Sequence, residues 1–338
     1  MKKILNYTAI LAMCAMVVLS SCNKDDEDET LLYLDGSPMF ELPIYASVGD
    51  TLTLYASGVI TEGATYRWTF PCLDTIAFYN DTTVAVIYVP DTLGTFTVSL
   101  IADAGDEYYS SSTSQKITSL SDKSLTGLPQ ASITFVDPRD SKEYPVVEIG
   151  NLQWFAKNLN WNGKGTGYGK TEAAANVLGR LYTWNDATGG ESASGLGNGV
   201  QGVCPEGWSI PTNEDWIDLA MALNGGTEVK FVSDWKDIAG KLMVPAKFNG
   251  SAIWPYSPNV NLTNDYGWNA IPGGSSYNNY SNYQNIFDYG LWWSCTERDS
   301  STAHYRYIFK DYPNVSVNYT AKSDGLGVSV RCVRLIKK

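Results

Sequence analysis

The chain contains six cysteines, whose type and spacing could support metal binding, disulfide formation or covalent modification. No CxxC pair occurs and the chain has a single histidine, so the spacing argues against zinc and iron–sulfur sites. Widely separated cysteines can instead form disulfides in an exported protein or carry a covalent modification, and their positions alone do not say which of them pair. They are Cys14, Cys22, Cys72, Cys204, Cys295 and Cys332.

Cys22 stands where the composition changes abruptly. Lys2 and Lys3 precede a mostly apolar run, Ile4 to Leu19, which has the layout of a signal peptide and is short for a membrane span. After Cys22 five acidic side chains follow within a few positions. Such a self-repelling run cannot join a packed core, so we interpret residues 22–32 as a solvated acidic tether.

The stretch Leu19-Ser20-Ser21-Cys22 resembles the lipobox of bacterial lipoproteins. The resemblance implies that residues 1–21 are cleaved off and that the sulfur of Cys22 carries diacylglycerol, with several acyl chains, palmitate among them, holding the protein at the outer membrane. One acyl chain binds a membrane only marginally, whereas several bind firmly. The alternative is an ordinary secretory signal with an incidental cysteine.

Lys24-Asp25-Asp26 resembles the export signal of Bacteroidetes surface lipoproteins. This resemblance implies a location on the outer face of the outer membrane. The alternative is that these residues are a spacer and carry no export signal.

Length and charge limit the remaining possibilities. Without the leader, the 338-residue chain is long enough for two domains. Its formal net charge is −12 and no cluster of lysine or arginine occurs, which argues against nucleic acid as a partner. Beyond the leader, no apolar run approaches the ~20 residues of a membrane helix.

Residues 33–120 show short alternating runs separated by turn residues, which predicts an all-β sandwich. In Ala64–Phe70 the aromatic residues Tyr66, Trp68 and Phe70 fall on one face. The segment resembles PKD and other Ig-like bacterial modules, although Pro71–Asp74 replaces their acidic-glycine turn. We expect a spacer domain, followed by a polar linker over residues 121–130.

Several blocks in the C-terminal part resemble the FISUMP family (Fibrobacter succinogenes major paralogous domain). The resemblance implies an α+β, C-type-lectin-like fold for residues 131–338 and a disulfide between the family-typical Cys204 and Cys332. Cys295 stands where the family usually has serine, so we expect a buried free thiol. The blocks are Ile133–Trp161, GRLYTW from Gly179, CPEGWSIPTNEDW from Cys204, YGWNAIPGG from Tyr266, WWSCTE from Trp292 and GVSVRCVRL from Gly327.

Local patterns predict the elements of this domain. Thr212 is a good helix N-cap, with Asp215 three residues later and an apolar stripe behind it. A second short helix is expected from Asp234, and a closing strand over Gly327–Leu335. Trp268, Trp292 and Trp293 are expected to lie in the core.

An aromatic, amide-rich stretch from Ala252 to Tyr289 is the candidate binding region, with Tyr277 to Tyr283 expected on a loop. Tyrosine offers a rigid apolar face with a polar edge, which suits a glycan. The core of the domain also needs aromatic side chains, so a structural role is the alternative. The candidate ligand-binding residues are Trp254, Tyr256, Tyr277, Tyr280 and Tyr283.

No catalytic, metal or cofactor site is expected. His304 has no catalytic or metal-binding partners in its pattern. Gly163–Thr171 lacks the spacing of a phosphate-binding loop. Trp184-Asn185-Asp186 mimics the calcium-binding triplet of C-type lectins but reads as helix and lacks the companion loop.

We therefore expect a mixed fold, in which an all-β Ig-like sandwich precedes an α+β C-type-lectin-like domain. The expected function is that of a surface-exposed, lipid-anchored binding protein which recognises a glycan or another cell-surface ligand. A fimbrial tip or accessory subunit is the alternative. An enzyme resembling formylglycine-generating enzymes comes third, since it would require a reactive pair formed by Cys295 and Cys332.

Overall fold

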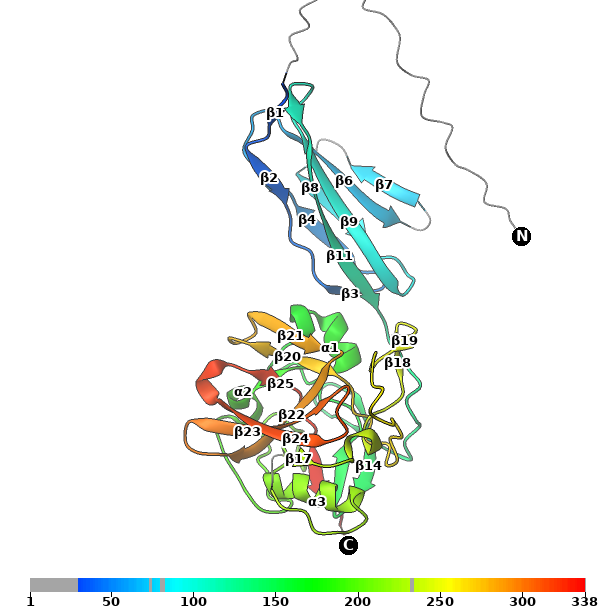
Figure 1. Cartoon of the computed structure of the whole chain (residues 1–338), viewed down its shortest axis with the longest axis vertical. Coiled ribbons are helices and arrows are strands. Elements are labelled where there is room, and N and C mark those ends of the chain that lie inside the picture. Colours follow the sequence, from blue (N-terminus) through cyan, green and yellow to red (C-terminus); the bar gives the residue numbers. More distant parts are fainter. Residues whose placement is uncertain (1–29, 73–74, 80–82, 232–233, 338) are drawn as a thin grey trace, which may run out of the picture.

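The computed structural model describes residues 30–72, 75–79, 83–231 and 234–337 of the chain. The fold is mostly β, with 41% strand and 11% helix, and a β-sheet unit precedes a β-rich domain with a few helices (Figure 1). The predicted fold class is confirmed at this level. The predicted leader, Cys14, Cys22 and all but the end of the predicted tether lie outside the described residues.

The N-terminal unit is built on a five-stranded sheet of order β3-β11-β9-β6-β7. All neighbouring pairs are antiparallel except β3 and β11, which are parallel. Tyr66, Trp68 and Phe70 share the buried face of β6, as their alternation predicts. The strands are β3 (Tyr45–Ser47), β6 (Thr65–Cys72), β7 (Thr75–Tyr79), β9 (Gly94–Asp103) and β11 (Ser111–Leu120).

Three two-stranded ribbons, β1-β10, β2-β5 and β4-β8, complete this unit. Leu54 of β4 and Ile87 of β8 belong to the same buried cluster as Trp68 of β6. The β4-β8 ribbon therefore faces the large sheet across a common core, which gives two β layers. The ribbon strands are β1 (Leu32–Tyr33), β2 (Gly36–Met39), β4 (Thr51–Tyr55), β5 (Ser57–Val59), β8 (Val84–Tyr88) and β10 (Tyr108–Tyr109).

The N-terminal unit and the second domain meet end to end (Figure 1). Tyr45 and Leu120 of the N-terminal unit belong to a core cluster of the second domain, so the units share a packed joint. Tyr45 of β3 is buried, and the centroid of its ring lies 6.4 Å from those of both Tyr168 and Phe248. The side-chain amide of Asn249 donates to the carbonyl of Ser119 at 3.1 Å. Residues 121–130, predicted as a linker, contain β12 (Leu125–Thr126), which pairs with β18 (Lys247–Phe248).

The second domain contains four small sheets, of orders β13-β14-β15-β26, β16-β25-β20-β21, β17-β24-β23-β22 and β12-β18-β19. The remaining strands are β13 (Ile133–Val136), β14 (Glu143–Ile149), β15 (Leu152–Phe155), β16 (Tyr182–Thr183), β17 (Asp234–Trp235), β19 (Ser251–Ala252), β20 (Gly273–Tyr277), β21 (Asn282–Ile286), β22 (Tyr289–Glu297), β23 (Thr302–Phe309), β24 (Val315–Ala321), β25 (Gly327–Val328) and β26 (Val333–Leu335).

Short helices surround these sheets. The longest, α3, begins after Thr212, and Thr212 and Asp215 form the predicted capping box. Its buried residues include Trp216 and Leu219 of the predicted apolar stripe. The helices are α1 (Glu172–Leu178), α2 (Trp184–Thr188) and α3 (Asn213–Leu223), with 3-10 turns η1 (Tyr168–Lys170), η2 (Ala239–Lys241) and η3 (Lys322–Asp324).

Three local predictions were right only in part. The segment from Asp234 begins as strand β17, on which Trp235 is buried, and Asp237 has a φ of 59°, so its helical part is the 3-10 turn η2. Tyr280 lies in the turn of the β20-β21 hairpin, whereas Tyr277 and Tyr283, predicted on the same loop, lie on its paired strands. The closing strand is interrupted between β25 and β26.

The core predictions of the second domain are confirmed. Trp268, Trp292 and Trp293 are at most 1% exposed. Cys204 and Cys332 form the predicted disulfide, with their Cα atoms 5.9 Å apart. It ties the segment that leads into α3 to the segment between β25 and β26.

Cys295 of β22 is a buried free thiol, as expected. Burial raises its pKa to about 11, and its sulfur lies 3.3 Å from the carbonyl of Ile210. Within the part of the chain that the structure describes, no helix combines the length and apolar character needed to cross a bilayer.

Candidate functional site

The structure separates the five predicted ligand-binding residues. Trp254 is 3% exposed, and its indole N–H donates to the carbonyl of Ala270 at 3.1 Å. Its ring fills the core, so it does not present a face to a ligand, contrary to the prediction. Tyr256 is 64% exposed.

Tyr280 has a structural role at the turn of the β20-β21 hairpin. Its hydroxyl donates to a carboxylate oxygen of Asp186 at 2.5 Å and accepts from the backbone N–H of Thr183 at 2.8 Å. Burial and the hydrogen bond to Asp186 raise the pKa of Tyr280. This hydroxyl therefore holds the turn against the start of α2 and is not free for a ligand.

Tyr283 belongs to the joint between the two units. The centroid of its ring lies 5.2 Å from that of Tyr168, which in turn packs against Tyr45 of the N-terminal unit. Tyr283 is thus part of an aromatic contact that spans three segments of the chain.

Tyr277 lies elsewhere, in a group that we call the tyrosine face: Tyr277, Tyr289, Tyr305 and Tyr307. All four are partly buried and pack on the same core cluster. The ring centroids of Tyr289 and Tyr307 are 6.0 Å apart, and those of Tyr305 and Tyr307 are 6.3 Å apart. The structure therefore gathers partly buried rings from β20, β22 and β23 in one group.

Strand alternation explains this arrangement. Arg306 and Ile308 point into the core from β23, so Tyr305 and Tyr307 point the other way. In the register with β22, Tyr305 stands opposite the buried Trp293. Directly opposite residues point to the same face of a sheet. The two rings therefore lie side by side in an edge-to-face contact, with their centroids 5.9 Å apart.

Tyr289 and Tyr305 of the tyrosine face have raised pKa values. Burial, followed by the neighbouring Tyr277 and Tyr307, raises the pKa of Tyr305 to about 12. Burial and then Tyr307, Asp288 and Tyr277 raise the pKa of Tyr289. At neutral pH these hydroxyls can each donate and accept a hydrogen bond.

The charged groups beside Tyr289 balance each other. Asp288 forms an ion pair with Lys310 at 2.6 Å. Asn318, opposite Tyr305 on β24, adds an exposed amide to the edge of the surface. The site thus offers apolar rings, neutral donors and acceptors, and a locally compensated charge.

Tyr277 is among the ligand-binding residues predicted from the sequence, whereas Tyr289, Tyr305 and Tyr307 are not. The alternation of tyrosine with buried positions in Thr302–Phe309 was the signal for Tyr305 and Tyr307. The position of Tyr289 depends on the register of β22 with β23, which the sequence does not show.

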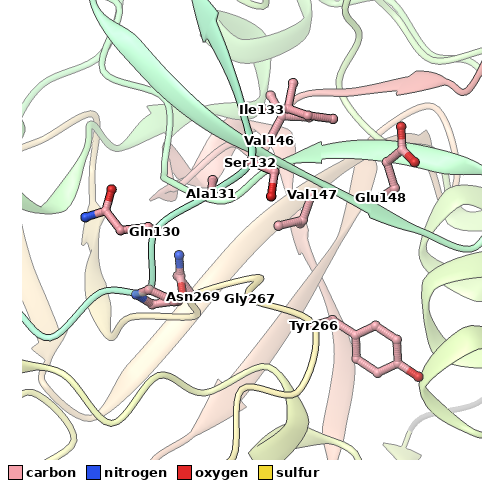
Figure 2. Close-up of a pocket in the computed structure, with 11 residues that line it drawn as sticks. Gln130, Ala131, Ser132, Ile133, Val146, Val147, Glu148, Tyr266, Gly267 and Asn269 are labelled. Carbon is pink, nitrogen blue, oxygen red and sulfur yellow. The ribbon is translucent and has the colours of Figure 1, made fainter.

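A pocket of about 290 Å³ is a second candidate (Figure 2). Its lining includes Gln130 and Asn269 on one side and Glu148 and Tyr266 on the other. Glu148 accepts from Gln153 at 2.8 Å, and the Tyr266 hydroxyl donates to a carbonyl at 3.1 Å. The Asn269 amide oxygen accepts from Asn264 at 2.7 Å. Because three of its polar side chains bind within the protein, the pocket is the weaker candidate.

Among the described residues, no group of three or more histidine, cysteine, aspartate or glutamate side chains could hold a metal ion. His304 lies on β23 with its Nδ1 3.5 Å from the Asn213 amide, and burial lowers its pKa. Because Cys332 is bonded to Cys204, Cys295 and Cys332 do not form a reactive pair.

Comparison with known proteins identifies one family. The model described as Fibrobacter succinogenes major domain matches residues 147–334, which is more than half of the chain. No curated protein and no solved structure matches. The match contains β15, the helices α1, α2 and α3, both disulfide cysteines and the whole tyrosine face. The chain therefore belongs to the Fibrobacter succinogenes major domain family.

Proposed function

We propose that this protein is a surface-exposed lipoprotein that binds a neutral glycan at the tyrosine face. The observation that carries the proposal is the group of four partly buried tyrosines on β20, β22 and β23. Sugar rings have apolar C–H faces and hydroxyl rims, which match a tyrosine ring and its hydroxyl.

The rigidity of the surface supports recognition. Tyr289, Tyr305 and Tyr307 lie on paired strands, and the buried Trp293 packs edge-to-face beside Tyr305. Binding therefore orders few side chains, which limits its entropic cost.

The charges favour a neutral glycan over an acidic one. Asp288 is neutralised by Lys310, so neither group is available to an ionic ligand without breaking their pair. The net charge of −12 repels polyanions at long range.

The lipid anchor at Cys22, and a place on the outer face of the outer membrane, belong to the same proposal. The lipobox and the Lys24-Asp25-Asp26 sequence support it. We further assign the N-terminal unit to the PKD or Ig-like spacers, on the strength of its two β layers, and the second domain to the C-type-lectin-like folds.

A glycan array probed with the mature chain, followed by titration of each positive glycan, tests ligand binding. We expect neutral glycans to bind, and Tyr305→Ser and Tyr307→Ser each to weaken binding at least tenfold. Tyr55→Ser is the control, since Tyr55 is exposed but lies on β4 of the N-terminal unit, away from every candidate binding residue, and it should leave affinity unchanged. An array without positives would favour the alternative role as a fimbrial tip or accessory subunit.

Metabolic labelling with a fatty acid tests the anchor separately. The wild-type protein should be labelled and Cys22→Ala should not. Equal labelling of both proteins would refute lipidation at Cys22.

A further inference from the structure

Four large apolar side chains are exposed together at one end of the N-terminal unit. We call this group the apolar tip: Leu32, Tyr33, Ile60 and Tyr109, which are 55%, 82%, 76% and 45% exposed. Single exposed apolar residues are ordinary, but a group at one end of a domain indicates a contact surface.

Strand pairing brings the apolar tip together. Tyr33 of β1 stands opposite Tyr109 of β10, with ring centroids 5.2 Å apart. The backbone N–H of Ile60 donates to the carbonyl of Asp35 at 2.9 Å, which places Ile60 beside the residues that follow β1.

The apolar tip lies at the end of the unit from which the N-terminal segment leaves. Figure 1 shows β1 at the opposite end of this unit from β3, whose Tyr45 contacts the second domain. The apolar tip is therefore turned away from the tyrosine face and towards the attachment point of the chain.

The distance to that attachment point is short. Cys22 precedes Leu32 by about ten residues, which span at most ~35 Å when fully extended. A tether of this length holds the apolar tip at an effective concentration in the millimolar range near the membrane, so even weak contacts become populated. We propose that the apolar tip rests on the lipid surface as a second contact besides the anchor; this step builds on the lipid anchor proposed above.

The side chains suit the polar-apolar boundary of a bilayer. Tyrosine places an apolar ring and a hydroxyl there, and leucine and isoleucine add apolar area. Four acids surround the apolar tip, and no lysine or arginine occurs in residues 30–66 or 101–115. The lipid surface that fits is therefore zwitterionic and not anionic. The acids are Asp35, Glu62, Asp106 and Glu107.

Hydrogen exchange on vesicles tests the proposal without relying on acylation. The mature chain carrying Cys22→Ser and an N-terminal histidine tag is captured on phosphatidylcholine vesicles that contain a nickel-chelating lipid. The amides of residues 31–34 and 107–110 should exchange at least threefold more slowly than in the same protein captured through a C-terminal tag. Vesicles in which phosphatidylglycerol replaces half of the phosphatidylcholine should give less protection.

Paired variants make the result specific. Tyr33→Ser together with Ile60→Ser should remove the protection. Tyr55→Ser together with Val86→Ser, on the exposed face of the β4-β8 ribbon, should retain it. Equal exchange in both capture orientations would overturn the proposal, whereas the labelling of Cys22 decides the anchor by itself.

Discussion

The guanidinium of Arg331 donates a 2.7 Å hydrogen bond to the side-chain oxygen of Asn158, 173 positions earlier in the chain. Arg331 is fully buried, and its remaining hydrogen bonds go to carbonyls of Phe155, Trp268 and Asn269. The guanidinium also lies 4.3 Å from the ring of Trp268. Burial lowers its pKa to about 9, which still leaves it charged at neutral pH. One side chain thus connects three segments of the second domain.

Arg331→Lys should destabilise the domain strongly. A lysine ammonium cannot reach four acceptors arranged around a planar guanidinium. Each buried acceptor left unpaired costs ~1–3 kcal/mol. We therefore expect the free energy of unfolding to fall by about 3 kcal/mol or more. Urea denaturation followed by tryptophan fluorescence measures this loss.

Arg334→Lys is the matched control for that experiment. Arg334 bonds to Gln153 at 2.7 Å and lies over the ring of Trp208, but it is only partly buried. Its replacement should cost about 1 kcal/mol or less, as for exposed polar contacts. Similar losses in the two variants would show that Arg331 is not the centre of this network.

Removal of the disulfide should also lower stability. The Cys204–Cys332 bond closes a loop with a sequence separation of 128, for which the chain-entropy model gives ~4–5 kcal/mol. Cys332→Ala should therefore lower the urea midpoint, while Cys295→Ala, which removes an unpaired buried thiol, should cost much less. If reduction left the midpoint of the wild-type protein unchanged, the bond would not stabilise the fold.

The buried carboxyl of Asp215 should make stability depend on pH. Burial raises its pKa to about 6, against the lowering effect of its hydrogen bonds from Gly197 and Thr212. Since the folded state binds this proton more tightly than the unfolded state, the contribution is full below pH ~4 and is lost as the pH rises through 6.

Asp215→Asn isolates this contribution. The variant loses part of the capping box, yet its stability relative to wild type should improve as the pH rises from 4 to 7. Denaturation at several pH values measures the difference, and Glu214→Gln controls for the removal of negative charge from the same helical turn. A difference that is constant with pH would contradict the assignment.

The sequence predicted elements wherever local pattern and burial agree. The capping residue Thr212 and the stripe through Trp216 were sufficient to predict α3. The β strands of the N-terminal unit followed from simple alternation, as in Tyr66 and Trp68. The disulfide followed only from the family resemblance, because spacing alone does not choose a pair.

The candidate site could be predicted only in part because contacts distant in sequence decide it. Trp254 and Tyr277 both lie in the same polar-aromatic stretch, but one fills the core and the other lies at the surface. In the turn of the β20-β21 hairpin, Asn278 and Asn279 adopt positive φ values, which asparagine tolerates. Asparagine is equally expected in a polar loop, so these residues do not distinguish a hairpin turn from a loop. The burial of Trp254 and the hairpin at Tyr277 both depend on the register of the strands, which the sequence does not show.

The two-residue length of β1 has a mechanical consequence. A ligand held at the tyrosine face and a tether fixed at Cys22 would pull on opposite ends of the molecule. Force from the second domain acts on β11, which pairs with β9 from Ser111 to Ser119. The opposing force from the tether acts on β1, in which only Leu32 and Tyr33 pair with β10. Tension would therefore separate β1 from β10 first. This would lengthen the tether while the rest of the N-terminal unit and the second domain stay folded.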